Sequence, residues 1–98
     1  MSNYKTEFPN YDQELVFPDG WVDTSWHNDV SPSFEKQFGN VMYKIWCDYK
    51  DPEKREVGGE QFTVCFTVYI EDEVNFVCIG QFETLLEALE LVNKETTK

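Results

Sequence analysis

The chain has 98 residues, a length that suits one domain with one hydrophobic core. Its apolar fraction of 41% and aromatic fraction of 16% exclude a disordered chain, and no apolar run approaches the roughly 20 residues of a membrane span. Nineteen acidic and eight basic residues give a net charge of −11, which disfavours binding to nucleic acids and anionic membranes and favours basic partners.

The first part of the chain predicts an N-terminal extended arm, residues 1–20, attached to a single domain, residues 21–98. Aromatic residues, acids and two prolines occur in the arm without a helical or strand period. Glu14–Phe17 favours a short edge strand, and Pro18–Gly20 favours a turn. We expect the aromatic side chains of the arm to lie on the domain, because in water they would form an unusually apolar tail.

The segment 23–34 predicts an ordered loop rather than a helix. Its Asp, Asn, Ser and Thr side chains are short and bond readily to nearby backbone groups. Pro32 keeps the residue before it out of the helical region. Trp26 and Phe34 would pin this loop, and Gly39-Asn40 would then turn the chain into the next strand.

Three segments alternate with the period of a β-strand: 41–49, 60–70 and 74–82. In the first segment, both sets of alternating residues include apolar side chains, which indicates a strand that is covered on both faces or placed centrally in the sheet. A charged loop, 50–59, and a tight acidic turn, 71–73, connect the three segments in order. Local connections of this kind predict an antiparallel meander.

A helix is predicted from residue 84 to 95. Thr84 and Glu87 have the spacing of a capping box, in which the Thr84 hydroxyl accepts from the backbone N–H of Glu87 and the Glu87 side chain accepts from the backbone N–H of Thr84. The helix carries an apolar stripe that would lie on a sheet face: Leu85, Ala88, Leu89 and Val92. The predicted fold class is α+β, a three-stranded antiparallel β-meander with one C-terminal helix packed on a face, plus the N-terminal arm.

The three cysteines, Cys47, Cys65 and Cys78, are odd in number and form no C-x-x-C motif. This spacing favours reduced thiols over a disulfide framework. The N-terminus also lacks the apolar segment of a secretory signal. Both observations predict a cytoplasmic protein.

Four short motifs follow one another along the chain: Ser25-Trp26-His27-Asn28-Asp29, Pro32-Ser33-Phe34, Asp48-x-x-Asp51-Pro52-x-x-Arg55-Glu56 and Phe62-x-Val64. In their order, these motifs resemble a group of small prokaryotic and phage-type proteins of unknown function. The resemblance covers roughly 21–92 and leaves the arm outside. It implies a phage or bacterial cytoplasmic setting and brings no known activity, so no catalytic role is transferred.

Catalytic, cofactor-binding and metal-ligating residues are not assigned by any pattern in the chain. His27 is the single histidine, and the phosphate-binding, dinucleotide-binding and nucleophile-elbow motifs are missing. An alternative hypothesis is a small enzyme or ligand-binding module on the 23–34 loop, with His27 as a base oriented by Asp23 or Asp29. In the structural interpretation of the same motifs, Arg55 pairs with an acid of the neighbouring loops, namely Asp29, Asp48 or Glu56.

The function predicted is a small acidic interaction protein without enzymatic activity. It would bind a basic protein surface, such as that of a nucleic-acid-binding protein, as a phage-encoded inhibitor or a nucleic-acid mimic. Direct binding to nucleic acid or to a membrane is not expected, and the protein would be a monomer or a homodimer. A homo-oligomeric structural or regulatory module, paired through sheet edges or the open sheet face, is the other alternative. The candidate contact residues are Trp26, His27, Asn28, Asp29, Asp48, Arg55, Glu56, Glu71, Asp72 and Glu73.

Overall fold

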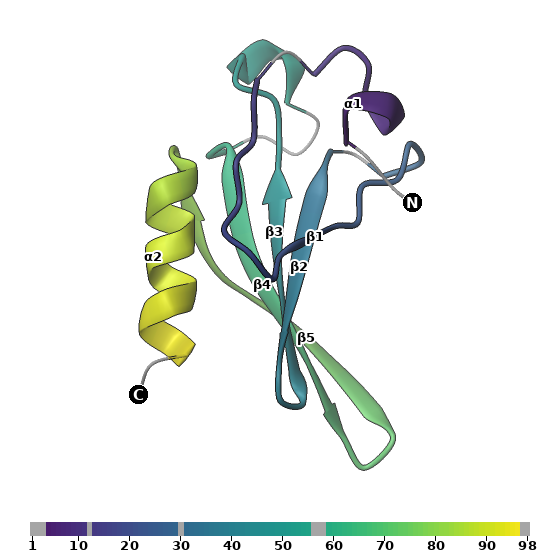
Figure 1. The fold of residues 1–98 in the computed structure, drawn as a ribbon, viewed down its shortest axis with the longest axis vertical. Helices are drawn as coiled ribbons and strands as arrows, with labels where there is room; N and C mark the ends of the chain where they lie inside the picture. The colour runs from purple at the N-terminus through teal and green to yellow at the C-terminus, as the bar shows by residue number, and fades with distance from the viewer. Residues whose placement is uncertain (1–3, 12, 30, 56–58, 97–98) are drawn as a thin grey trace.

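The computed structural model describes residues 4–11, 13–29, 31–55 and 59–96. The α+β class and the C-terminal helix are confirmed (Figure 1). Each strand pairs antiparallel with the next one in sequence, so the sheet has the order β1-β2-β3-β4-β5. The elements are α1 (Tyr4–Glu7), β1 (Val22–Asp23), β2 (Ser33–Phe38), β3 (Val41–Cys47), the 3₁₀ turn η1 (Pro52–Lys54), β4 (Phe62–Ile70), β5 (Glu73–Phe82) and α2 (Leu85–Thr96).

The predicted three-stranded meander is wrong, because the described residues form a sheet of five strands. The two additional strands, β1 and β2, come from the region around the predicted loop. β2 pairs along its whole length with β3, from Ser33 opposite Trp46 to Phe38 opposite Val41. Gly39 has a φ of 61° and takes the first position of the two-residue turn between them, where a type II′ hairpin needs a positive φ. The glycine therefore makes a hairpin, and the residues before it are a strand.

The N-terminal arm is not extended throughout, since Tyr4–Glu7 form the single helical turn α1. Glu14–Phe17, expected as an edge strand, lies outside the sheet. The expectation that the aromatic side chains of the arm lie on the domain is confirmed. Tyr4, Phe8 and Tyr11 are all buried, and Tyr4 packs edge-on against Tyr11. The arm therefore supplies part of the core.

One hydrophobic core lies between the sheet and a second layer made by the arm and α2. Ile45 of β3 and Val64 of β4 stand directly opposite each other, and neither side chain is exposed. Ala88 and Val92 bring α2 onto this cluster. The arrangement agrees with the central position predicted for strand 41–49, because β3 is the middle strand of five. No helix among the described residues is long and apolar enough to cross a membrane.

The capping box at the start of α2 is present in a modified form. The backbone N–H of Glu87 donates to the Thr84 hydroxyl at 3.3 Å, as predicted. The Thr84 hydroxyl in turn donates to the Glu87 carboxylate at 2.8 Å, so this carboxylate bonds to the Thr84 side chain. Both contacts hold the first helical turn in place.

The expectation of three reduced cysteines is wrong, because Cys65 of β4 and Cys78 of β5 form a disulfide. The register between the two strands places these residues directly opposite each other. Cys47 is free and fully buried, and burial raises the pKa of its thiol well above the ordinary value. The cysteine-based argument for a reducing compartment therefore no longer holds.

Candidate functional site

The most exposed part of the sheet is the hairpin formed by the ends of β4 and β5, which extends away from the rest of the molecule (Figure 1). β3 begins at Val41, opposite Val68 of β4. Beyond this point the ladder has only two strands and closes with the pair Ile70–Glu73. The acidic turn predicted at residues 71–73 is therefore the tip of a protruding hairpin.

The tip has an unusual backbone conformation for its sequence. Glu71 and Asp72 both have positive φ, 47° and 68°, as the two central residues of a type I′ hairpin turn require. Asn, Asp and Gly are the residues that normally occupy these positions, because most other side chains, such as that of Glu71, cost about 1–2 kcal/mol per residue in the left-handed region. The turn thus carries two exposed carboxylates at the expense of conformational stability.

Large apolar side chains near the tip are exposed to solvent. Val74 and Phe76 of β5 are 60% and 54% exposed, and Ile70 of β4 is 54% exposed. Val77 is 43% exposed and points to the sheet face opposite that of Val74 and Phe76. Ile70 shares the face of Val77 because it pairs with Glu73. A single exposed apolar residue has no special meaning, but a group on one projecting hairpin is typical of an interaction surface.

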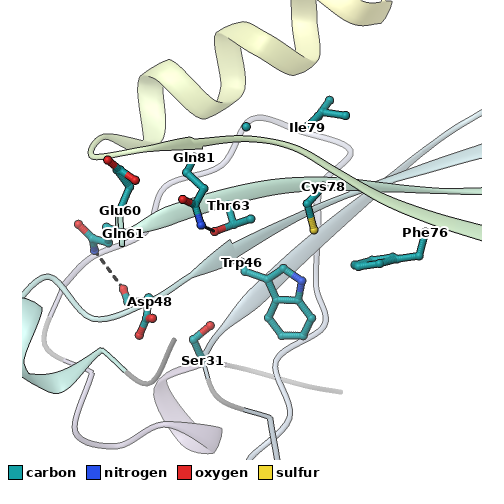
Figure 2. A pocket seen from close by; sticks show the side chains of 11 residues that line it. Ser31, Trp46, Asp48, Glu60, Gln61, Thr63, Phe76, Cys78, Ile79 and Gln81 are labelled. Atoms are coloured by element: carbon teal, nitrogen blue, oxygen red, sulfur yellow. Dashed lines mark hydrogen bonds between the residues drawn. The ribbon is translucent and has the colours of Figure 1, made fainter. Parts of the chain in front are cut away.

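A groove of about 730 Å³ lies on the sheet face opposite α2, beside the edge strand β5. Figure 2 shows Trp46, Cys78 and Phe76 pointing to the side of the sheet away from the helix. The Nζ atom of Lys44 lies 4.2 Å from the centroid of the Trp46 ring and 3.4 Å from a carboxylate oxygen of Glu35. Polar side chains therefore cover part of this face. Residues lining the groove also include Ser31, Asp48, Glu60, Gln61, Thr63, Ile79, Gly80 and Gln81.

Asp48, a predicted contact residue, forms part of the floor of this groove and is 6% exposed. Its carbonyl oxygen accepts from Tyr11 Oη at 3.1 Å and from Gln61 Nε2 at 3.2 Å. Its carboxylate accepts from the Tyr49 N–H at 2.8 Å. Burial raises the pKa of Tyr11 well above its ordinary value, so the phenol remains protonated and donates this bond. These contacts connect the arm to the sheet.

The predicted base His27 lies on the surface and contacts a residue of the arm. Its side chain is 56% exposed, and its Nδ1 lies 3.0 Å from the Glu7 carboxylate. The predicted orienting residue Asp23 instead accepts from the backbone N–H groups of Tyr4 and Ser25. The hydrogen bond from His27 lowers the pKa of Glu7. Glu7, which the sequence did not single out, is the partner of His27.

The other predicted residues of this loop have separate positions. Trp26 is 49% exposed and packs against the His27 ring, with 4.3 Å between the ring centroids. Asn28 is exposed, and the Asp29 N–H donates to the Trp26 carbonyl in a tight turn. Among the described residues, no cluster of three or more His, Cys, Asp or Glu could hold a metal ion. This loop presents an aromatic and polar surface.

Arg55 does not pair with Asp29 or Asp48 as predicted, and the third predicted partner, Glu56, lies outside the described residues. Its guanidinium instead donates to both carboxylate oxygens of Glu83 at 3.2 and 3.3 Å. It also donates to three backbone carbonyl groups, those of Tyr49, Lys50 and Gly59. The side chain is 6% exposed, so Arg55 fixes the η1 loop against the start of α2.

The sequence-predicted residues that the structure describes therefore fall into four separate places, and of these only Asp48 lines the groove. Trp26–Asp29 contact the arm, Arg55 holds the η1 loop, and Glu71–Glu73 form the hairpin tip. The groove residues Trp46 and Phe76 were not selected from the sequence. No family model matches this chain, and comparisons with curated proteins and with solved structures also found no match.

Proposed function

We propose that this protein is a small, acidic binding protein without enzymatic activity, which docks on a basic surface of another protein through its β4–β5 hairpin. The observation that carries the proposal is the projection of the hairpin beyond β3, with exposed apolar side chains next to a turn of acidic residues. A net charge of −11 on 98 residues adds long-range attraction toward a basic partner.

Inhibition by docking is favoured over mimicry of nucleic acid. A mimic needs carboxylates in one continuous row with a spacing like that of phosphates. Figure 1 places η1, with its acidic loop, at the opposite end of the molecule from the β4–β5 turn. The two acidic groups therefore do not form one continuous row, and the hairpin tip with its apolar neighbours is better suited to a local protein contact.

The site supports a binding function better than catalysis around His27. An exposed histidine with one surface carboxylate lacks the enclosed, water-excluded setting in which a base acts efficiently. The proposal includes the phage or bacterial, cytoplasmic setting expected from the motifs. In a reducing compartment the Cys65–Cys78 pair would exist as two thiols.

Site-specific photo-crosslinking in lysate from cells that express the protein tests this proposal. A photoreactive residue is placed at Asp72, on the hairpin tip, or at Glu90, exposed on α2. We expect the Asp72 probe to capture a protein through a basic surface and the Glu90 probe not to do so. Capture at both positions alike, or at neither, would contradict docking through the hairpin.

Charge reversal then tests the role of the carboxylates in the captured complex. The pair Glu71→Lys and Asp72→Lys is compared with the matched pair Asp19→Lys and Glu90→Lys at other exposed positions. Each reversal changes the charge by two, so both variants go from −11 to −7. The hairpin pair should slow association about tenfold and flatten its salt dependence, because steering depends on local charge. Equal effects of the two pairs would mean that only net charge matters.

A further inference from the structure

The free edge of β5 and the groove beside it indicate how a partner would bind. We propose that the partner docks as an extended segment that adds a sixth strand along β5. This segment has apolar side chains at alternate central positions and a basic residue near each end. The inference rests on the proposed function and specifies the chemistry of its partner.

The phase of the sheet hydrogen bonds shows which backbone groups of β5 face outward. The Asp48 N–H donates to the Gln61 carbonyl at 2.8 Å, so this pair is hydrogen-bonded between β3 and β4. Hydrogen-bonded and non-hydrogen-bonded pairs alternate along an antiparallel ladder. The pair Lys44–Cys65 lies four positions further along, so it is also hydrogen-bonded. Cys65 therefore directs its N–H and C=O toward β3. Its partner Cys78 directs its own backbone groups to the free edge, in agreement with the short 3.9 Å between their Cα atoms.

The same alternation gives Val74 and Phe76 outward-facing backbone groups. β5 is the last strand in the described sheet, so none of the described strands pairs with this edge. An edge with several free N–H and C=O groups and apolar side chains is a template for an additional strand. Three alternate residues of β5 can thus exchange backbone hydrogen bonds with a partner.

The groove receives the side chains of such a segment. Phe76 and Cys78 both line it from β5, and the Trp46 indole forms its opposite wall (Figure 2). A strand paired with β5 would place every second side chain on this same sheet face. The apolar lining by Trp46, Phe76 and the disulfide therefore selects apolar residues at these alternate positions.

Acidic side chains lie at both ends of the exposed edge. Glu71, Asp72 and Glu73 are exposed at the hairpin tip. Glu60 is exposed and lines the opposite end of the groove. Lys44, a basic side chain on this face, pairs with Glu35. Charge complementarity therefore favours a basic residue at each end of the incoming segment.

A second copy of this chain is a poorer occupant of the same edge. If two β5 strands paired antiparallel around Phe76, the Glu71-Asp72 turn of one copy would lie beside Gly80 and Gln81 of the other. Glu60 lines the groove at that position, so carboxylates would meet carboxylates. Each copy also carries a charge of −11, which adds general repulsion.

The inference is tested with a synthetic peptide that has two lysines, five alternating valine and threonine residues, and two arginines. The control peptide has the same sequence with N-methyl groups on all central amides, which keeps the charges and removes the backbone donors. NMR titration of ¹⁵N-labelled protein measures both affinities. We expect the parent peptide to shift the amide signals of Val74, Phe76 and Cys78 and the Trp46 indole signal. We expect the methylated peptide to bind about tenfold more weakly, because several backbone hydrogen bonds are lost.

Two results would overturn strand addition without contradicting the proposed function. One is equal binding of both peptides, which would indicate charge attraction alone. The other is binding of neither peptide, while the Asp72 probe still captures a basic protein. The variant Phe76→Ala supplies a further check, since it should weaken binding of the parent peptide severalfold by removing one wall of the groove. Unchanged affinity in this variant would place the peptide elsewhere.

Discussion

The two ends of the β4–β5 ladder have similar sequences and opposite surroundings. At one end Phe62 and Val64 are 1% and 0% exposed, and at the other end Ile70 and Val74 are 54% and 60% exposed. Both ends alternate apolar and polar residues. The difference lies in what covers them, because the arm, α2 and β3 all pack near the first end and β3 does not reach beyond Val68. An alternating pattern therefore identifies a strand but does not show that its apolar face is buried.

The sharpest test of this contrast compares two phenylalanines, one at each end. Phe62→Ala should lower the free energy of unfolding by about 3–5 kcal/mol, because it leaves a cavity in the packed core. Phe76→Ala should change it by only about 0.5 kcal/mol, as expected for an exposed position. Urea denaturation measures both values. Similar losses in the two variants would mean that the hairpin end is packed as well as the core end.

The disulfide lies between the packed and exposed parts of the ladder and should stabilise the pairing there. Its two cysteines are 13 residues apart, a loop for which reduction should cost about 2–4 kcal/mol of stability. Urea denaturation with and without reductant measures this loss. Mass spectrometry after alkylation in denaturant provides the control. Without reduction one thiol, that of Cys47, should be alkylated, and after reduction all three cysteines should be alkylated. Three modified thiols without reduction would show that the disulfide is absent.

The hairpin tip offers a substitution that should separate stability from binding. Replacing Glu71 with Asn and Asp72 with Gly supplies the residues that a type I′ turn prefers. The free energy of unfolding should rise by about 1 kcal/mol, since positive φ is no longer strained. Association with a basic partner should slow, because two carboxylates are lost. A more stable variant that binds at the original rate would show that these two acids do not contribute to docking.

The smallest effect concerns the contact between the arm and the 23–34 loop. The hydrogen bond from His27 lowers the pKa of Glu7 below its ordinary value of 4.5. A carboxyl group with a lowered pKa in the folded state contributes stability above its unfolded pKa, and this contribution is lost as pH falls through the folded value. NMR titration of the Glu7 carboxyl carbon should show a midpoint below 4.5 that rises in His27→Ala. An identical midpoint in both proteins would mean that the contact does not form in solution.

Local sequence patterns predicted the elements whose causes are local. The capping residues and the apolar stripe of α2 predicted this helix to within one residue at each end, because cap and stripe both act within the helix. The acidic turn after residue 70 was also predicted, although it has two residues, Glu71 and Asp72, and Glu73 already belongs to β5. β2 was missed because Ser31, Pro32 and Ser33 around its start resemble a loop, although Gly39-Asn40 is a hairpin signal that predicts a strand on both sides.

The disulfide could have been predicted from turn length. The structure closes the hairpin with two residues, and Cys65 and Cys78 each stand five residues from the closing pair Ile70–Glu73. A two-residue turn therefore places them directly opposite each other. The sequence-based interpretation used a three-residue turn, which shifts the register by one and separates the cysteines.

The groove and the Arg55 contacts depend on the tertiary fold. The ion pair of Arg55 with Glu83 joins residues 28 positions apart, so no local spacing indicates it. Trp46 of β3 and Phe76 of β5 line the same groove because both strands pair with β4, and the register of these pairings brings the two side chains to one face. No sequence pattern indicates a special role for these two residues, because each one fits an ordinary strand position.

The central claim, a free β5 edge available to a partner, is tested most directly by amide hydrogen exchange along β5 in the protein alone. NMR resolves the individual amides. The structure predicts alternation, with fast exchange at Val74 and Phe76, whose N–H groups face outward, and slower exchange at Asn75 and Val77, which bond to β4. Uniformly slow exchange across all four amides, at protein concentrations where the chain is monomeric, would contradict the account, because the edge would already be covered.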